Sequence, residues 1–375
     1  MADSAVSRLR KLGQLGQSPW YDNIDRSLIE NGELKKLFDL GIVGVTSNPT
    51  IFEKAIIGSS VYDDKISALK KKGLSIEAIY DDLTADDVRD AAGLLKGVYD
   101  GTNKQDGYVS IEVLPAYAHD AVKTIDYARY IYKKIGCNNV MVKVPGTQES
   151  YEAIRELIRD GININATLIF SVSQYEHAAK AFIDGMRDRL GEGKDISGIA
   201  SVASVFISRI DTKVDAILDV FANRADNFEI KQKICSLKGK AAISNAKFIY
   251  QRFKDLFTER NFGDLKARGA MVQRPLWAST STKNQAYSDC IYVDNLIGPK
   301  TVNTMPHQTV EAFLDHGKVA LSLDGDLEVA NSYLSRIQEI GINLATVCEE
   351  SQKDGVAAFE RSFDTLMSAI KNKAV

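Results

Sequence analysis

The 375-residue sequence contains few cysteines, the residues that stabilise many small proteins through disulfides or metal sites. It has four cysteines, and they lie too far apart for the short spacing that is typical of metal-binding pairs. We therefore expect buried, reduced thiols in a reducing cytosol. A chain of this length can bury about three quarters of its surface, so the fold needs neither a disulfide nor a metal. The cysteines are Cys137, Cys235, Cys290 and Cys348.

An excess of charge of either sign is also missing. There are 47 basic and 50 acidic side chains, which gives a net charge of -3. This balance offers no support for binding to nucleic acid or to an anionic membrane, where affinity comes from neutralised phosphates. No run approaches 18 consecutive apolar residues, and the basic residues at 8–11 precede no apolar segment. We predict a cytoplasmic protein that crosses no membrane.

Proline is scarce as well, with seven residues, and no Pro-rich or low-complexity linker marks a domain boundary. At about 150 residues per domain, the length suggests two or three domains. A single closed barrel with insertions reaches the same length. Length alone therefore leaves the number of domains open.

What the sequence does contain is an alternation of two periods. Short apolar runs typical of strands alternate with segments whose apolar residues recur at helical spacing, as at 88–99 and 122–135. A capping box of Ser173 with Glu176 and a C-terminal Gly161 are expected helix boundaries. The eight predicted strands are Trp20–Ile24, Ile42–Thr46, Tyr108–Val113, Asn139–Val144, Ile162–Phe170, Ile199–Ser204, Pro275–Ala278 and Cys290–Val293.

Eight strands with intervening helices favour a parallel (β/α)8 barrel of the TIM type. A doubly wound sheet more often has five to seven strands and a Gly-rich phosphate turn, and no such motif is present. We interpret residues 1–375 as one barrel domain with helical insertions at about 50–107 and 211–273 and a helical extension at about 315–375. Separate domains are the less favoured alternative.

The predicted fourth strand places a lysine on its polar face. Three valines at 140, 142 and 144 share one face, so Lys143 points the other way, into the barrel if helices cover the valines. A buried ammonium is expensive to desolvate, and a lowered pKa would leave an amine that attacks a carbonyl carbon to form a Schiff base. The alternative is a lysine that reaches water or pairs with a carboxylate.

Neighbouring strands place further polar groups on the same interior. Glu112 lies on the polar face of the third strand, and Asn165 and Thr167 on that of the fifth. A carboxylate beside an amine can move protons through water, although a simple buried ion pair of Glu112 with Lys143 is equally compatible. At the end of the first strand, Asp22 is the better catalytic candidate, because Asp25 can cap the next helix.

The segment Gly44–Phe52 ends the second strand with Thr46 and Asn48, which can offer a hydroxyl and an amide to a polyol. A local Asn-Pro turn is the commoner explanation of such a string. Together with seven other ordered segments, it makes the chain resemble the transaldolase family of Schiff-base enzymes, in its longer bacterial form. Those segments are Trp20–Asp25, Val109–Val113, Val140–Gly146, Gly161–Ser171, Ser204–Arg209, Arg274–Asn284 and Asp294–Pro306.

The resemblance implies a role for each matching residue. Lys143 corresponds to the Schiff-base lysine, Glu112 to the carboxylate that handles the catalytic water, and Asp22 to the general acid/base. Phe206 corresponds to an aromatic wall and Arg209 to a phosphate-binding arginine, although from the residues alone Arg209 could equally pair with Asp211 or Asp215. The family positions that hold donor hydroxyls or the water match Thr46, Asn48, Asn165, Thr167 and Ser204.

The chain departs from the family after the seventh strand. Many relatives have Ser-Phe-Arg there, whereas this sequence reads Ser279-Thr-Ser-Thr-Lys-Asn284. The second phosphate-binding cation would then be Lys283, with Ser281 as its hydroxyl partner. Lysine keeps the charge but lacks the planar fork of arginine.

The resemblance further implies transfer of a dihydroxyacetone unit between sugar phosphates in the pentose phosphate pathway. The covalent intermediate on Lys143 requires no metal or organic cofactor. Two alternatives stay open: a lyase of the fructose 6-phosphate aldolase type, which is shorter and has tyrosine in place of Glu112, and a catalytically silent phosphosugar-binding barrel. The expected partners are sugar phosphates only, and monomer and homodimer are equally compatible.

Overall fold

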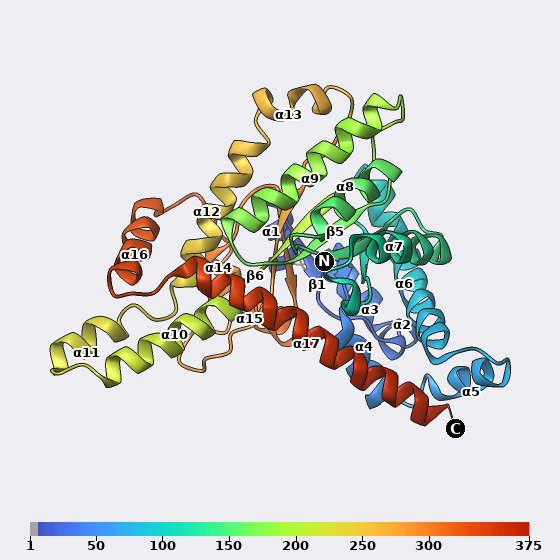
Figure 1. Cartoon of the computed structure of the whole chain (residues 1–375), viewed down its shortest axis with the longest axis horizontal. Helices are drawn as coiled ribbons and strands as arrows, with labels where there is room; N and C mark the ends of the chain where they lie inside the picture. The colour runs from blue at the N-terminus through green and yellow to red at the C-terminus, as the bar shows by residue number, and fades with distance from the viewer. Residues whose placement is uncertain (1–6, 375) are drawn as a thin grey trace, which may run out of the picture.

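A closed parallel barrel forms the centre of the molecule (Figure 1). The computed structural model describes residues 7–374, and within them eight strands pair in sequence order, with β8 closing onto β1. The predicted (β/α)8 architecture is therefore confirmed. The strands are β1 (Gln17–Tyr21), β2 (Gly44–Thr46), β3 (Tyr108–Glu112), β4 (Val140–Pro145), β5 (Ile164–Ile169), β6 (Ser201–Phe206), β7 (Arg274–Ala278) and β8 (Thr301–Met305).

Helices surround the barrel and fill the long connections. Within residues 7–374, none is long and apolar enough to cross a membrane. They are α1 (Arg8–Gln14), α2 (Arg26–Glu30), α3 (Glu33–Leu40), α4 (Pro49–Gly58), α5 (Asp63–Lys71), α6 (Ile76–Gly101), η1 (Pro115–Tyr117), α7 (Ala121–Ile135), α8 (Ser150–Asp160), α9 (Val172–Gly191), α10 (Ser208–Asn223), α11 (Phe228–Cys235), α12 (Ala241–Leu256), α13 (Glu259–Lys266), α14 (Ile291–Asn295), α15 (His307–His316), α16 (Leu327–Glu339) and α17 (Leu344–Lys373).

The prediction of the eighth strand was wrong. Cys290–Val293 is rich in residues that favour strands, yet it forms the start of α14, with Cys290 at the N-cap. The strand that closes the barrel is β8, and its threonines and asparagine hid it from a search for apolar runs. All residues of the two segments except Ile291 are buried, so tertiary packing overrides their local propensity.

Two helix boundaries were predicted with different success. Gly161 ends α8 in the left-handed conformation, at φ 90°, as expected of a C-terminal glycine. The capping box at the start of α9 was placed two residues too late: it is formed by Ser171 and Gln174. Glu176 instead forms an ion pair with Arg252 of α12. The glutamate of the Ser-x-x-Glu pattern therefore makes a tertiary contact and does not cap the helix.

A bulky side chain of β1 packs closely against the start of β2. The ring of Trp20 points inward from β1, and a Cβ atom at Gly44 would lie 2.4 Å from it. Glycine at the start of β2 therefore makes room for the indole. The buried apolar residues form one connected core. The organisation as a single domain stays a prediction.

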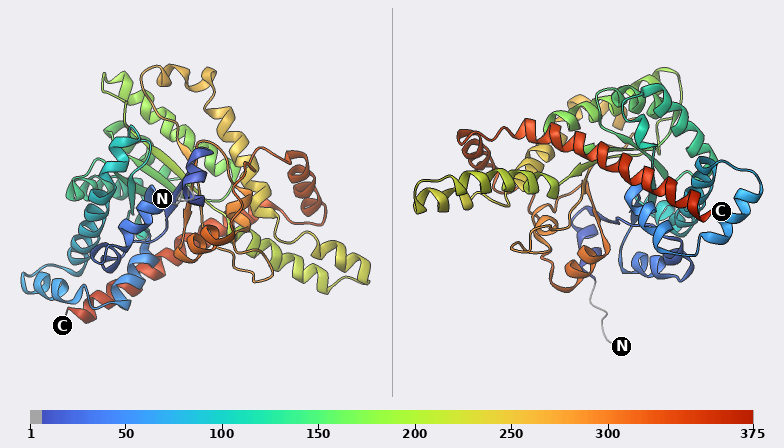
Figure 2. Two further views of the ribbon diagram at one scale, coloured as in Figure 1. Left: turned by 180° about the vertical axis from the view of Figure 1, so that it is seen from behind. Right: turned by 60° about the horizontal axis from the view of Figure 1, so that its bottom comes forward.

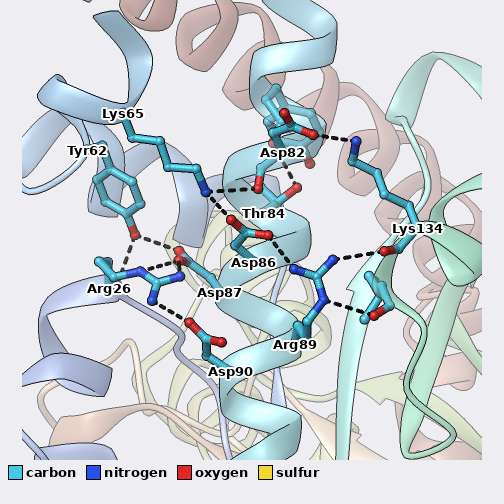
Figure 3. Close-up of polar contacts among 12 residues, drawn as sticks. Arg26, Tyr62, Lys65, Asp82, Thr84, Asp86, Asp87, Arg89, Asp90 and Lys134 are labelled. Atoms are coloured by element: carbon cyan, nitrogen blue, oxygen red, sulfur yellow. Dashed lines mark hydrogen bonds and ion pairs between the residues drawn. The ribbon is translucent and has the colours of Figure 1, made fainter. Parts of the chain in front are cut away.

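The long helix α6 carries acidic residues that pair with cations on the helices around it (Figure 3). Arg26, at the start of α2, contacts Asp87 and Asp90. Lys65 of α5 pairs with Asp86, and Lys134 of α7 with Asp82. Because Arg26 lies four residues after Asp22, these ion pairs also fix the connection that leaves β1.

The C-terminal helix α17 crosses the barrel at the end where the strands finish (Figure 2). The side-chain amide of Gln352 donates to the carbonyls of Gly146 and Leu168, at 2.7 and 2.9 Å, just after β4 and near the end of β5. Farther along, Ser362 shares a hydrogen bond with Thr50 of α4. The extension therefore covers part of the mouth of the barrel rather than only its flank.

Candidate active site

A cavity of about 250 Å³ opens at the C-terminal end of the strands. Of the twelve site residues predicted from the sequence, nine line it: Asp22, Thr46, Asn48, Lys143, Ser204, Phe206, Arg209, Ser281 and Lys283. A larger cavity of about 840 Å³ lies at the opposite end, among the starts of the strands. It contains none of the predicted site residues, so the smaller cavity is the candidate active site.

Lys143 extends from β4 into the barrel and is buried, as its place in the strand predicts. Its Nζ donates to the carbonyl oxygen of Ser47 at 3.0 Å and lies 3.3 Å from Oε2 of Glu112. In the strand register, Glu112, Lys143 and Asn165 are direct neighbours on β3, β4 and β5. The shared register explains why three residues far apart in the sequence meet at one point.

Asp22 follows the last residue of β1 and lines the same cavity as Lys143. Its Oδ1 accepts a hydrogen bond from the hydroxyl of Thr46 at 2.7 Å, and Thr46 is in turn 2.6 Å from the hydroxyl of Thr304. Loss of solvation raises the pKa of Asp22, and the charge of Lys143 opposes that rise. A carboxyl group in such surroundings is suited to exchange protons.

Glu112 is the second carboxyl group next to the amine. Burial raises its pKa, and the nearby Lys143 lowers it. Apart from this ion pair, its Oε2 has no hydrogen-bond partner among residues 7–374. Two carboxyl groups with raised pKa values therefore share the surroundings of one amine, which is an arrangement that supports proton transfer in both directions.

Asn165 and Thr167 lie behind the cavity, on β5. The amide of Asn165 donates to the hydroxyl of Ser110 at 3.1 Å and accepts from Ser204 at 2.7 Å. Thr167 is buried, and its hydroxyl has no partner within the described part of the chain. It precedes Leu168, which has a φ of 55° at an irregularity in the pairing of β5 with β6. Thr167 is thus a free polar group close to the reaction centre.

Arg209 lies at the mouth of the cavity, between two aromatic rings. Its guanidinium carbon is 5.3 Å from the ring centre of Phe206 and 6.0 Å from that of Phe359 on α17. Burial lowers the pKa of Arg209. Among residues 7–374 it forms no ion pair, because Asp211 and Asp215 accept hydrogen bonds from tyrosines instead. The alternative that Arg209 pairs with these carboxylates is therefore wrong.

Lys283 lines the same cavity, and its Nζ donates to the hydroxyl of Ser281 at 2.7 Å. Burial lowers the pKa of Lys283, and the neighbouring charges of Arg209 and Lys54 lower it further. Lys54, from α4, also lines the cavity. Three cationic side chains thus surround the mouth, which suits an anionic group on a ligand.

Comparison with known proteins agrees with this geometry. Residues 19–370 match the family described as Transaldolase/Fructose-6-phosphate aldolase. The chain belongs to this family. It is similar to Transaldolase 2 of Nostoc sp., with 45% identity over 373 residues that cover 98% of each chain. It is also 44% identical over 371 residues to a transaldolase of Trichodesmium erythraeum, again covering 98% of each chain. The identity to a transaldolase of Neisseria meningitidis serogroup C is 41% over 356 residues, covering 95% of this chain and 97% of the relative.

Membership of the transaldolase family confirms the resemblance drawn from the sequence, whereas several lining residues of the cavity were missed, among them Lys54, Thr304 and Phe359. Lys54 follows Thr50 and Ile51 at helical spacing, so the periodicity of 50, 51 and 54 was a usable signal. Thr304 was missed together with β8. Phe359 had no local signal, because its place at the cavity depends on the path of α17.

Proposed function

We propose that this protein is a transaldolase that moves a dihydroxyacetone unit from sedoheptulose 7-phosphate to glyceraldehyde 3-phosphate. The products are erythrose 4-phosphate and fructose 6-phosphate, within the non-oxidative pentose phosphate pathway. The observation that carries the proposal is a buried lysine, Lys143, that lines a cavity together with Asp22 and lies 3.3 Å from the carboxyl group of Glu112. Membership of the transaldolase family supports it.

The first half-reaction starts on Lys143. Glu112 takes a proton from the ammonium over the 3.3 Å that separate the two groups, and the amine adds to the C2 carbonyl of the ketose. A second proton of the nitrogen passes to the carbonyl oxygen, which becomes the C2 hydroxyl. Glu112 then returns the proton, through a water molecule, to the C2 hydroxyl, which leaves as water. The product is a protonated imine on Lys143. Glu112 thus acts as a base and as an acid in turn.

Asp22 performs the next proton transfer. It takes the proton of the C4 hydroxyl while the C3–C4 bond breaks, and the shortened aldose phosphate leaves. The electron pair of that bond moves into the imine and forms an enamine, which keeps three carbons on Lys143. The second aldose phosphate then reacts by the reverse of these steps. Because the imine is the electron sink, the proposed reaction needs no metal or organic cofactor.

The other side chains bind the substrate. Thr46, Asn48, Asn165 and Ser204 offer hydroxyls and amides to the sugar, although the side-chain oxygen of Asn48 also caps α4 by accepting from the amide of Ile51. The free hydroxyl of Thr167 is suited to hold the water. We assign the phosphate to Arg209, Lys283 and Ser281, with Phe206 as the wall beneath it. The side chains that bind the sugar hydroxyls retain the three-carbon unit on Lys143, which separates transfer from the release catalysed by an aldolase.

Borohydride trapping tests this proposal. The protein is incubated with fructose 6-phosphate and reduced, and the modified peptide is found by mass spectrometry. We expect the adduct on Lys143, its loss in Lys143→Ala, and its retention in Lys247→Ala, the matched control. Lys247 is also buried, but its Nζ donates to the carbonyl of Gly325, away from the cavity.

Each other outcome has a clear meaning. The absence of an adduct on Lys143 would refute the proposed enzymatic activity and leave a phosphosugar-binding barrel as the remaining interpretation. An adduct without transfer to erythrose 4-phosphate would indicate an aldolase-type lyase. Substantial turnover by folded Lys143→Ala would refute the role of the lysine.

We further propose that the protein acts in the cytoplasm as one barrel domain. The four cysteines, all within the described part of the chain, are free thiols, which suits a reducing compartment. Sugar phosphates are its proposed partners. Monomer and homodimer are equally compatible with this function.

A further inference from the structure

A second cluster of reactive side chains lies outside the cavity, where α14 begins and α15 ends. His316 is the last residue of α15, and its Nε2 is 2.8 Å from Oδ1 of Asp289 and 3.8 Å from Sγ of Cys290. These three atoms all lie within 4.8 Å of one another. The proposed function uses none of them.

The donor atoms are those that a zinc ion selects. Zinc binds thiolate sulfur, imidazole nitrogen and carboxylate oxygen, usually in a tetrahedral arrangement. We propose that Asp289, Cys290 and His316 bind a zinc-class divalent cation, with water as the fourth ligand. Cys290 is buried whereas the other two side chains are about half exposed, so the ion would be held at the surface with one side open to solvent.

The surroundings of the imidazole support this assignment. Nδ1 of His316 is 3.0 Å from Oδ2 of Asp315, while Nε2 faces the other two donors. A histidine that ligates a metal commonly donates its second ring N–H to a carboxylate, which fixes the orientation of the ring. Asp315 is therefore a positioning residue for the ion rather than a ligand.

The electrostatics of the cluster also favour a cation. The carboxylates of Asp289 and Asp315 lie 2.8 and 3.0 Å from the two ring nitrogens of His316. A divalent ion bound between the donor atoms would compensate these negative charges. Arg8 is a nearby opposing charge.

A bound ion would restrain the loop that carries Ser281 and Lys283. Between these two residues, the hydroxyl of Thr282 donates to the carbonyls of Ser288 and Asp289, at 2.9 and 3.2 Å. An ion on Asp289 and Cys290 would therefore fasten the end of the loop to α15. This consequence rests on the proposed function: the metal is expected to lower the KM for sugar phosphates and leave kcat nearly unchanged.

Cobalt(II) is the first probe, because a thiolate on cobalt gives a charge-transfer band in the near ultraviolet. The full chain is washed with a chelator and titrated with CoCl2, and the cobalt is then displaced with ZnCl2. We expect one equivalent with the thiolate band. Cys290→Ser should lose the band, and His316→Gln should weaken binding by about 100-fold, whereas Cys235→Ser, at an exposed thiol of α11, should change neither.

The variants distinguish a substitution that prevents folding from the absence of a metal site. His316 is at the surface, so His316→Gln keeps the test valid if Cys290→Ser does not fold. A thiolate band that survives Cys290→Ser, or cobalt affinity unchanged in His316→Gln, would overturn the site. Asp315→Asn is expected to reduce affinity by about 10-fold, as loss of an orienting partner does. Because the band does not depend on turnover, its absence would leave the proposed transaldolase function untouched.

Discussion

The contribution of Arg209 to substrate binding can be isolated by pairing a substitution with a change of substrate. Arg209 is held between Phe206 and Phe359 at the mouth of the cavity, and none of the described carboxylates pairs with it. Its guanidinium is therefore available for a phosphate. Arg209→Met removes the charge and keeps an apolar side chain between the rings.

The size of the effect follows from the hydrogen bonds that are lost. A guanidinium binds phosphate through two charge-assisted hydrogen bonds, each contributing about 1.5–3 kcal/mol. Lys283 and Lys54 remain at the mouth and offset part of the loss, so we take about 3 kcal/mol as the expected net effect. At 1.36 kcal/mol for each tenfold change, this corresponds to a decrease of about 150-fold in kcat/KM.

The assay compares fructose 6-phosphate with fructose as the donor and erythrose 4-phosphate as the acceptor of both. The decrease should appear in KM with the phosphorylated donor and nearly vanish with fructose, because binding of the phosphate is equal in the ground and transition states. Arg361→Met, at an exposed position of α17, is the matched control and should leave both rates unchanged. An equal decrease with both donors, in a variant with unchanged thermal stability, would refute phosphate binding by Arg209.

Three further predictions address the carboxyl groups and the C-terminal helix. Glu112→Gln should lower kcat by about 100-fold or more, because it removes the group that takes and returns the proton. Slower formation of the borohydride-trapped adduct in single-turnover experiments would show that formation of the imine is the affected step. Asp22→Asn should abolish transfer but raise the melting temperature at pH 7. The pKa of Asp22 is raised above 3.8 in the folded protein, so its ionised form destabilises the fold at pH 7. The difference in melting temperature between variant and wild type should therefore shrink as the pH falls through the folded pKa. A variant that melts below the wild type at pH 7 would contradict this prediction. Gln352→Leu leaves the carbonyls of Gly146 and Leu168 without their donor and should lower the free energy of unfolding by about 1–3 kcal/mol in urea titrations, whereas Gln338→Leu on α16 should have little effect.

Residues on the inner face of the strands were predictable because their position follows from local geometry. Side chains alternate along a strand, so the valines of β4 already place Lys143 on the opposite face. The same rule places Glu112 and Asn165 toward the interior. Parallel strands in register then bring these residues together, and the sequence needed to supply only the alternation and the order of the strands.

Residues that reach the site from outside the barrel strands were decided by the tertiary structure. Phe359 is about 150 residues from Phe206, and the two rings lie 6.5 Å apart only because α17 crosses the mouth of the barrel. The amphipathic pattern of α17 shows that one face is buried, but it does not show against what. The closing strand is a similar case, since Thr301–Met305 becomes a strand through its pairing with β1. Alternation is a property of neighbouring residues and can be read from the chain, whereas the choice of packing partner depends on the free energy of the whole fold.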